Sequence, residues 1–99
     1  MKNREKLAKM KIRIKYLLWL SEKAGVEAEE LDLPNKATLH QLLVEVGNRR
    51  PSLSKIIQEL LVGSSDIIIL VNSKTPLQGL ETPLKDFDEI TLIPPLSGG

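Results

Sequence analysis

The chain has 99 residues, 41% of them hydrophobic, and a net charge of +1, which suits one globular domain with a single core. It has no cysteine and one histidine, His40, which excludes disulfides, thiolate metal sites and a Cys/His metal cluster within one chain. The longest apolar runs, YLLWL and IIILV, are too short to cross a bilayer, and the first residues lack the apolar core of a signal peptide. We therefore expect a cytoplasmic protein.

Positive charge gathers at the start of the chain. The first fifteen residues contain one acid, Glu5, against Lys2, Arg4, Lys6, Lys9, Lys11, Arg13 and Lys15. A basic arm of this kind could contact nucleic acid or an acidic partner. A solvated leader followed by the polar face of a strand is the simpler interpretation, because no aromatic residue precedes Tyr16 to stack on bases.

The first strand is predicted from Lys11, where basic and apolar residues alternate with the period of a half-buried strand. We expect this strand to continue through LLWL, residues 17–20, with both faces apolar, and Gly25 to lie in the connection that follows. A second alternating run, EAEELDLP, ends at Pro34. The two runs are predicted to pair as a hairpin with a long loop.

Two helices are predicted next. Thr38 followed three residues later by Gln41 is a capping box, and an apolar stripe follows it at helical spacing: Leu39, Leu42, Leu43 and Val46. Gly47 weakens the end of this helix and Pro51 closes it. The segment SLSKIIQELLVG, residues 52–63, repeats the helical pattern, with Gly63 placed as its C-terminal cap.

Two strands complete the predicted order. The β-branched run IIILV, residues 67–71, is typical of a strand in the centre of a sheet, and EITLIPP, residues 89–95, gives a last strand that Pro94 stops. Phe87 lies in the turn before it, and we expect its ring to fold back over the core. Strands on either side of a helical middle predict an α+β domain with a mixed sheet packed on the first helix.

Five segments, in this order, resemble the β-grasp, ubiquitin-like sulfur carriers: KIRIKYLLWLSEKAG, LDLPNKATLHQLLVEV, ILVN, TPLKDFDEITL and PPLSGG. The resemblance is strongest to the MoaD family, the small subunits of molybdopterin synthase, with the ThiS carriers as cousins. It implies a mixed sheet of about four to five strands on one main helix with a second short helix. The expected divisions are a basic extension at 1–9, a β-grasp domain at 10–95 and a flexible Gly-Gly tail at 96–99.

The resemblance also implies a role as a carrier that is not itself a catalyst. An adenylyltransferase of the MoeB/ThiF type, similar to ubiquitin-activating enzymes, would use ATP and magnesium to convert the Gly99 carboxylate into an acyl-adenylate. A sulfur donor would then displace AMP and leave a thiocarboxylate. In a large, MoaE-type subunit that sulfur would attack a pterin precursor. The chain itself would bind no cofactor and no metal.

The tail suits this chemistry on physical grounds. The segment expected to enter a partner's active site consists of Pro94, Pro95, Leu96, Ser97 and Gly98, and it ends at Gly99. The two glycines have no Cβ to crowd an approaching nucleophile, and the two prolines favour an extended course. Residues 96–99 can span about 13 Å when extended.

The sequence leaves a docking surface and two other functions open. LLWL and TLI hold more apolar residues than one sheet face needs, so an exposed patch for partners is predicted among Leu17, Trp19, Leu92 and Ile93, with core packing as the alternative. A protein modifier, or a carrier for tRNA thiolation or thiamine synthesis, would need the same activated glycine. A β-grasp binding module with an incidental Gly-Gly end is the third interpretation.

Overall fold

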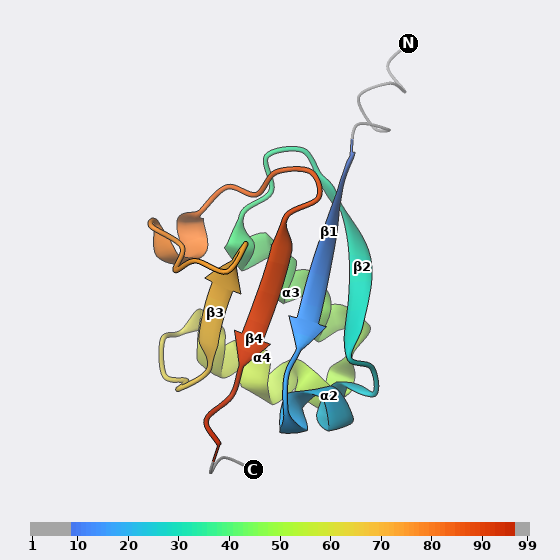
Figure 1. Ribbon diagram of the computed structural model, residues 1–99, viewed down its shortest axis with the longest axis vertical. Helices are drawn as coiled ribbons and strands as arrows, with labels where there is room; N and C mark the ends of the chain where they lie inside the picture. Colours follow the sequence, from blue (N-terminus) through green and yellow to red (C-terminus); the bar gives the residue numbers. More distant parts are fainter. Residues whose placement is uncertain (1–8, 97–99) are drawn as a thin grey trace.

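A four-stranded mixed sheet forms the centre of the computed structural model, which describes residues 9–96. The strands are β1 (Lys9–Tyr16), β2 (Ala28–Pro34), β3 (Ile68–Val71) and β4 (Glu89–Ile93), in the spatial order β2-β1-β4-β3. Figure 1 shows β1 and β4 side by side in the middle; they run parallel, and β2 and β3 are antiparallel to their neighbours. The first and the last strands of the chain therefore share the centre of the sheet.

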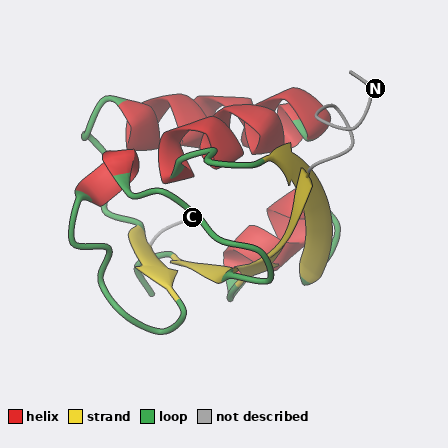
Figure 2. Cartoon of the chain, turned by 90° about the horizontal axis from the view of Figure 1, so that it is seen from above, coloured by secondary structure: helices red, strands yellow, loops and turns green. Residues whose placement is uncertain are grey.

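The longer helices cover one face of this sheet, and a short helix lies at its end beyond β1 (Figure 1). The helices are α2 (Trp19–Ala24), α3 (Leu39–Arg49) and α4 (Ser54–Leu61), with short 3₁₀ turns η1 (Pro51–Leu53) and η2 (Gly79–Glu81). Figure 2 shows the longer helices as a layer above the strands. The core lies between the two layers, and its fully buried side chains include Ile12, Ile14, Tyr16, Leu31, Leu39, Leu42, Leu43, Val46, Leu53, Ile90 and Leu92. The predicted α+β architecture is confirmed.

The predicted hairpin is present. The apolar side chains of β1 are buried while Lys9, Lys11 and Arg13 are exposed, and β1 pairs with β2 in a register that sets Ile12 opposite Leu31. The alternation in sequence thus predicted which face of β1 packs on the helices. Residues 1–8 of the predicted basic extension lie outside the described residues, and Lys9 already belongs to β1.

The capping box at the start of α3 is confirmed. The Thr38 amide donates to Gln41 Oε1 at 2.8 Å, and the Gln41 amide donates to Thr38 Oγ1 at 3.3 Å. Helix α3 runs through Gly47 to Arg49 and ends before Pro51, as expected, while the weakening effect predicted for Gly47 stays a prediction. A Cβ built on Gly47 would lie 3.4 Å from Ile57 Cγ2. Gly47 therefore allows α3 and α4 to pack closely.

The C-terminal cap of α4 is also confirmed. Gly63 has a left-handed φ of 76°, its amide donates to Leu60 O at 3.2 Å, and the Ser64 amide donates to Glu59 O at 2.9 Å. This pair of hydrogen bonds is the Schellman arrangement that glycine favours at a helix end.

The expected continuation of β1 through LLWL is wrong. The strand ends at Tyr16, and Leu18, with φ 53° and ψ −137°, turns the chain so that the Leu20 amide donates to Leu17 O at 3.0 Å. Helix α2 then begins at Trp19 and ends at Ala24, and Gly25, whose φ is 86°, caps it. Six residues are too few to display a helical period, so the local pattern did not distinguish this helix from a strand.

The central position expected for the IIILV run is wrong as well. Strand β3 is an edge strand that pairs only with β4 within residues 9–96, and 55% of the Ile68 side chain is exposed. Ile69 and Val71 pack against the core, while Ile68 and Leu70 alternate with them toward the other face. The run is apolar on both faces because the outer face of the sheet is apolar here too.

The expectation that the Phe87 ring folds back over the core is wrong. Its ring is 75% exposed, and its backbone has a φ of 68°. The Phe87 amide donates to Lys11 O at 2.7 Å, which fixes the turn beside β1. The left-handed backbone of this turn directs the side chain into solvent.

Candidate functional site

Strand β4 carries the end of the chain out of the domain. Pro94 is buried, Pro95 is half-buried, and Leu96 is 86% exposed. The expectation that Pro94 enters a partner's active site therefore needs correction, since this residue packs within the domain. The exposed tail begins at Leu96. Ser97, Gly98 and Gly99 lie outside the described residues, and the role predicted for them stays a prediction.

Trp19 contacts the base of this tail. Its ring is half-buried against the core, and its indole Nε1 donates to Pro95 O at 3.0 Å across 76 positions of sequence. Trp19 belongs to α2, so it is not part of the outer face of the sheet. The position of the ring was not predictable, because LLWL was interpreted as a strand.

An apolar patch lies on the outer sheet face, beside the point where the tail leaves. Ile90 and Leu92 point into the core, so Ile93 points outward, and its register partner on β3 is Ile68. The Leu17 amide donates to Leu92 O at 3.2 Å, which sets Leu17 next to Ile93. We call this surface the outer apolar patch; it consists of Leu17, Ile68, Leu70 and Ile93.

The docking role predicted for Leu17, Trp19, Leu92 and Ile93 stays a prediction, but the structure shows which of these residues lie on the outer face. Leu17 and Ile93 are half-buried and face outward, but Leu92 is 1% exposed and is excluded from any surface contact. Ile68 and Leu70 were missed. The sequence held a signal for them, because the IIILV run is apolar on both faces of the strand, whereas packing on the core requires only one apolar face.

The remainder of the outer face is charged and internally paired. Lys11 Nζ lies 3.4 Å from Asp32 and 3.9 Å from Glu30, both on β2, and Glu89 of β4 lies 3.9 Å from Arg13 and 3.7 Å from Lys15. Pairs this exposed contribute little stability. They do neutralise the basic side of β1, which supports the interpretation of these residues as the polar face of a strand.

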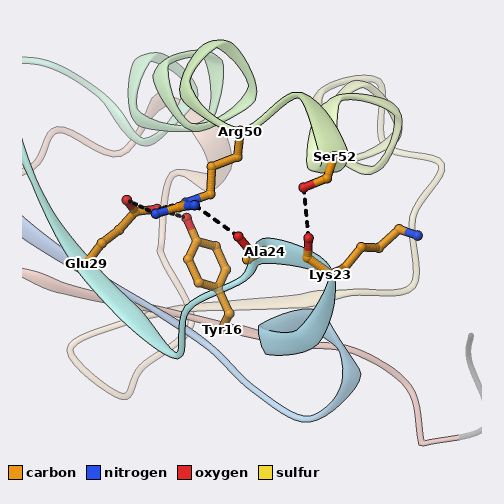
Figure 3. A network of polar contacts seen from close by, with 6 residues as sticks. All are labelled: Tyr16, Lys23, Ala24, Glu29, Arg50 and Ser52. Atoms are coloured by element: carbon orange, nitrogen blue, oxygen red, sulfur yellow. Dashed lines mark hydrogen bonds and ion pairs between the residues drawn. The ribbon is translucent and has the colours of Figure 1, made fainter.

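A partly buried polar network joins several elements on the helical side (Figure 3). Arg50 grips the Glu29 carboxylate with Nε at 2.6 Å and Nη2 at 2.8 Å, while its Nη1 donates to Ala24 O at 2.9 Å. The Tyr16 hydroxyl donates to Glu29 Oε2 at 2.6 Å. Ser52 Oγ donates to Lys23 O at 2.8 Å. Arg50 and Ser52 thereby satisfy carbonyls at the end of α2.

The protonation states of this network are fixed. Hydrogen bonds from Arg50 hold the pKa of Glu29 below its usual range, and the Tyr16 hydrogen bond adds to this effect. Burial, then the hydrogen bond to Glu29, raises the pKa of Tyr16. Glu29 stays ionised and Tyr16 stays protonated near neutral pH. Neither is poised for acid–base catalysis, so the network holds the structure together.

The described residues 9–96 hold no group of three or more metal-ligating side chains. Asp86 accepts from the Lys11 amide at 2.8 Å, and Asp88 accepts from the Lys85 amide at 2.8 Å, as expected for carboxylates that shape a turn. His40 is exposed on α3. No helix in this part of the chain has the length and apolar character that spanning a membrane requires.

Comparisons with known proteins agree with this architecture. The family model for ThiS matches residues 14–99. A molybdopterin synthase sulfur carrier subunit from Chlamydomonas reinhardtii is 29% identical over 90 residues, which are 91% of this chain and 100% of the relative.

Two solved structures share the fold. Small archaeal modifier protein 1 from Methanosarcina acetivorans is 32% identical, with a TM-score of 0.74 over 92% of this chain and 98% of its own. A candidate molybdopterin converting factor subunit 1 from Pyrococcus furiosus is 25% identical, with a TM-score of 0.72 over 88% of this chain and 99% of its own.

The mixed sheet and the main helix packed on it are those expected of a ubiquitin-like carrier, and the predicted β-grasp fold is confirmed. The family match extends from the middle of β1 to the final residue, so it includes the tail as well as the domain. The chain therefore belongs to the ThiS family of sulfur carriers, which also includes the MoaD-type subunits.

Proposed function

We propose that this chain carries sulfur for molybdopterin synthesis on the carboxylate of Gly99, as a thiocarboxylate. The observation that carries the proposal is the exit of the chain from the centre of the sheet, with Leu96 exposed beside the outer apolar patch. Membership of the ThiS family and 29% identity to a molybdopterin synthase sulfur carrier subunit support the choice of pathway.

The chemistry needs an activated acyl group. A carboxylate is a poor electrophile, so the Gly99 carboxylate attacks the α-phosphate of ATP, and magnesium pyrophosphate leaves. A sulfide donor then adds to the acyl carbon, AMP departs with the C–O bond, and a thiocarboxylate remains. Glycine suits both steps, because no Cβ crowds the carbonyl.

Partners supply the catalytic groups in this proposal. The chain acts as a non-catalytic subunit, and an adenylyltransferase of the MoeB/ThiF type performs the activation. A large, MoaE-type subunit then receives the tail and uses its sulfur. Residues 96–99 reach about 13 Å when extended, which suffices to enter a buried site. The outer apolar patch beside the tail provides the docking surface.

A second candidate function is protein modification. It is favoured by the 32% identity to small archaeal modifier protein 1. Modification would use the same adenylate at Gly99, but a lysine amine would take the place of sulfide and form an isopeptide bond.

The test is an intact-mass measurement. The full chain is incubated with an adenylating partner, ATP, magnesium and sulfide, and replacement of one oxygen by sulfur is expected. The variant that lacks Gly99 is the control and gains no sulfur. If the full chain also gains no sulfur with several adenylating partners that modify their own carriers, the proposal is wrong. Isopeptide adducts in cells, without any loss of molybdoenzyme activity when the gene is deleted, would favour the modifier.

A further inference from the structure

The base of the tail, Pro94 and Pro95, is fixed by a single main-chain hydrogen bond within the described residues. Pro94 and Pro95 have no amide N–H, so neither can extend the ladder of β4. Within the described residues, the main chain of residues 94–96 makes one hydrogen bond, in which the Pro95 carbonyl accepts from the Trp19 indole at 3.0 Å. The next residue, Leu96, is exposed. The indole thus binds the last main-chain group before the tail leaves the surface.

Trp19 lies on α2, a helix with hydrogen bonds at both of its ends. At its start, the turn at Leu18 is closed by the Leu20 amide, and Ser21 Oγ donates to Leu18 O at 2.9 Å. At its end, Arg50 and Ser52 donate to the carbonyls of Ala24 and Lys23 (Figure 3). Leu18 adopts a positive φ that non-glycine residues rarely accept. A strained residue directly before Trp19 indicates that the placement of this helix is under structural constraint.

We propose that Trp19 is a positioning residue for the reactive tail, an inference that rests on the proposed function. Its indole fixes the Pro95 carbonyl and so fixes the point from which residues 96–99 extend. With the Pro95 carbonyl fixed, a partner needs to order only the four residues 96–99, which span about 13 Å when extended, so less conformational freedom is lost on binding. Ring packing alone does not require the N–H donor, because a phenylalanine could fill much of the same space.

The variant Trp19→Phe separates the hydrogen bond from the packing. With the adenylating partner, measured by ATP–pyrophosphate exchange, the variant is expected to raise KM for the carrier about 3- to 10-fold with kcat unchanged, as the loss of one hydrogen bond predicts. The thermal midpoint should change little. Glu22→Ala, on the same helix, is the matched control and leaves KM as in the wild type. An unchanged KM in Trp19→Phe would overturn the proposal, and so would a loss in kcat alone.

A second measurement needs no variant. Trp19 is the only tryptophan, so its indole N–H gives one assignable signal in a ¹⁵N-labelled sample of the full chain. We expect slow exchange of this proton with solvent, both free and with the adenylating partner bound. Exchange as fast as in free tryptophan would overturn the proposed positioning role of Trp19, even if Trp19→Phe failed to fold. If the wild-type chain is not adenylated but the indole N–H exchanges slowly, the proposed function is wrong while the hydrogen bond from Trp19 to Pro95 is supported.

Discussion

Two exposed apolar residues have backbone angles that glycine would adopt more easily. Leu18 has φ 53° and Phe87 has φ 68°, and each lies where the chain turns beside β1. Leu18 is about half exposed and Phe87 is largely exposed, so burial offsets only part of the backbone cost. For Phe87 the fixed element is the main chain, whose amide donates to Lys11 O.

Phe87→Gly should therefore be tolerated. Relief of left-handed strain is worth about 1 kcal/mol, and the greater freedom of glycine in the unfolded chain costs about 0.5–1 kcal/mol, so the free energy of unfolding should stay within about 1 kcal/mol of the wild type. Urea denaturation measures it. Leu92→Ala, at a buried site, is the control and should lose about 2–5 kcal/mol. A loss of that size in Phe87→Gly would mean that the ring packs on the core.

At the scale of elements, one ion pair holds four segments together. Glu29 lies on β2, its partner Arg50 follows α3, the Tyr16 hydroxyl comes from β1, and the Ala24 carbonyl ends α2. The pair is partly buried and bidentate, so it is stronger than the exposed pairs on the outer face of the sheet. Because it satisfies the end of α2, it also supports the helix that carries Trp19.

This pair should make stability depend on pH. The folded-state pKa of Glu29 lies below its ordinary value of 4.5, so its contribution is fully present above that pH and is lost as pH falls through the lowered folded value. Glu29→Gln should lose about 2 kcal/mol at pH 7, and its difference from the wild type should shrink below pH 4.5. Urea denaturation across this range checks it. Glu30→Gln, exposed on the same strand, should differ little at any pH, and a pH-independent gap in Glu29→Gln would contradict the assignment.

Local signals were predictable from the sequence, and long-range ones were not. The capping box at Thr38 and the cap at Gly63 depend on neighbours within a few residues, and both are present. The contacts Glu29–Arg50 and Trp19–Pro95 join residues 21 and 76 positions apart, so no local pattern announces them. The short helix α2 was missed for a related reason. The turn at Leu18 that ends β1 depends on tertiary structure, which the local pattern does not show.

At the scale of the whole molecule, the two sides of the sheet have separate tasks. One side packs on the helices and forms the core. The other carries charges paired across β2, β1 and the start of β4, and the outer apolar patch lies over β3, the end of β4 and the adjacent Leu17. The patch adjoins Leu96, so under the proposed function a partner bound to the patch would have its active site near the tail. Which alternate residues would face outward could not be fixed before the register was known.

The outer apolar patch should be required for partner binding. Ile68→Lys, on an edge strand, should change the free energy of unfolding by less than about 0.5 kcal/mol, because charge is well tolerated there. It should weaken binding to the adenylating partner about tenfold or more, as measured by calorimetry. Leu77→Lys is the matched control, since Leu77 is 98% exposed and lies beyond the opposite end of β3. Equal weakening by both variants would exclude a specific role for the patch.

The central place of β4 ties folding to translation. Until the ribosome has added Ile93, β1 has no parallel neighbour and β3 has no partner at all within the described residues, so half of the sheet cannot form. Such long-range pairing is slow, and a chain that stalls earlier exposes core strands to proteases.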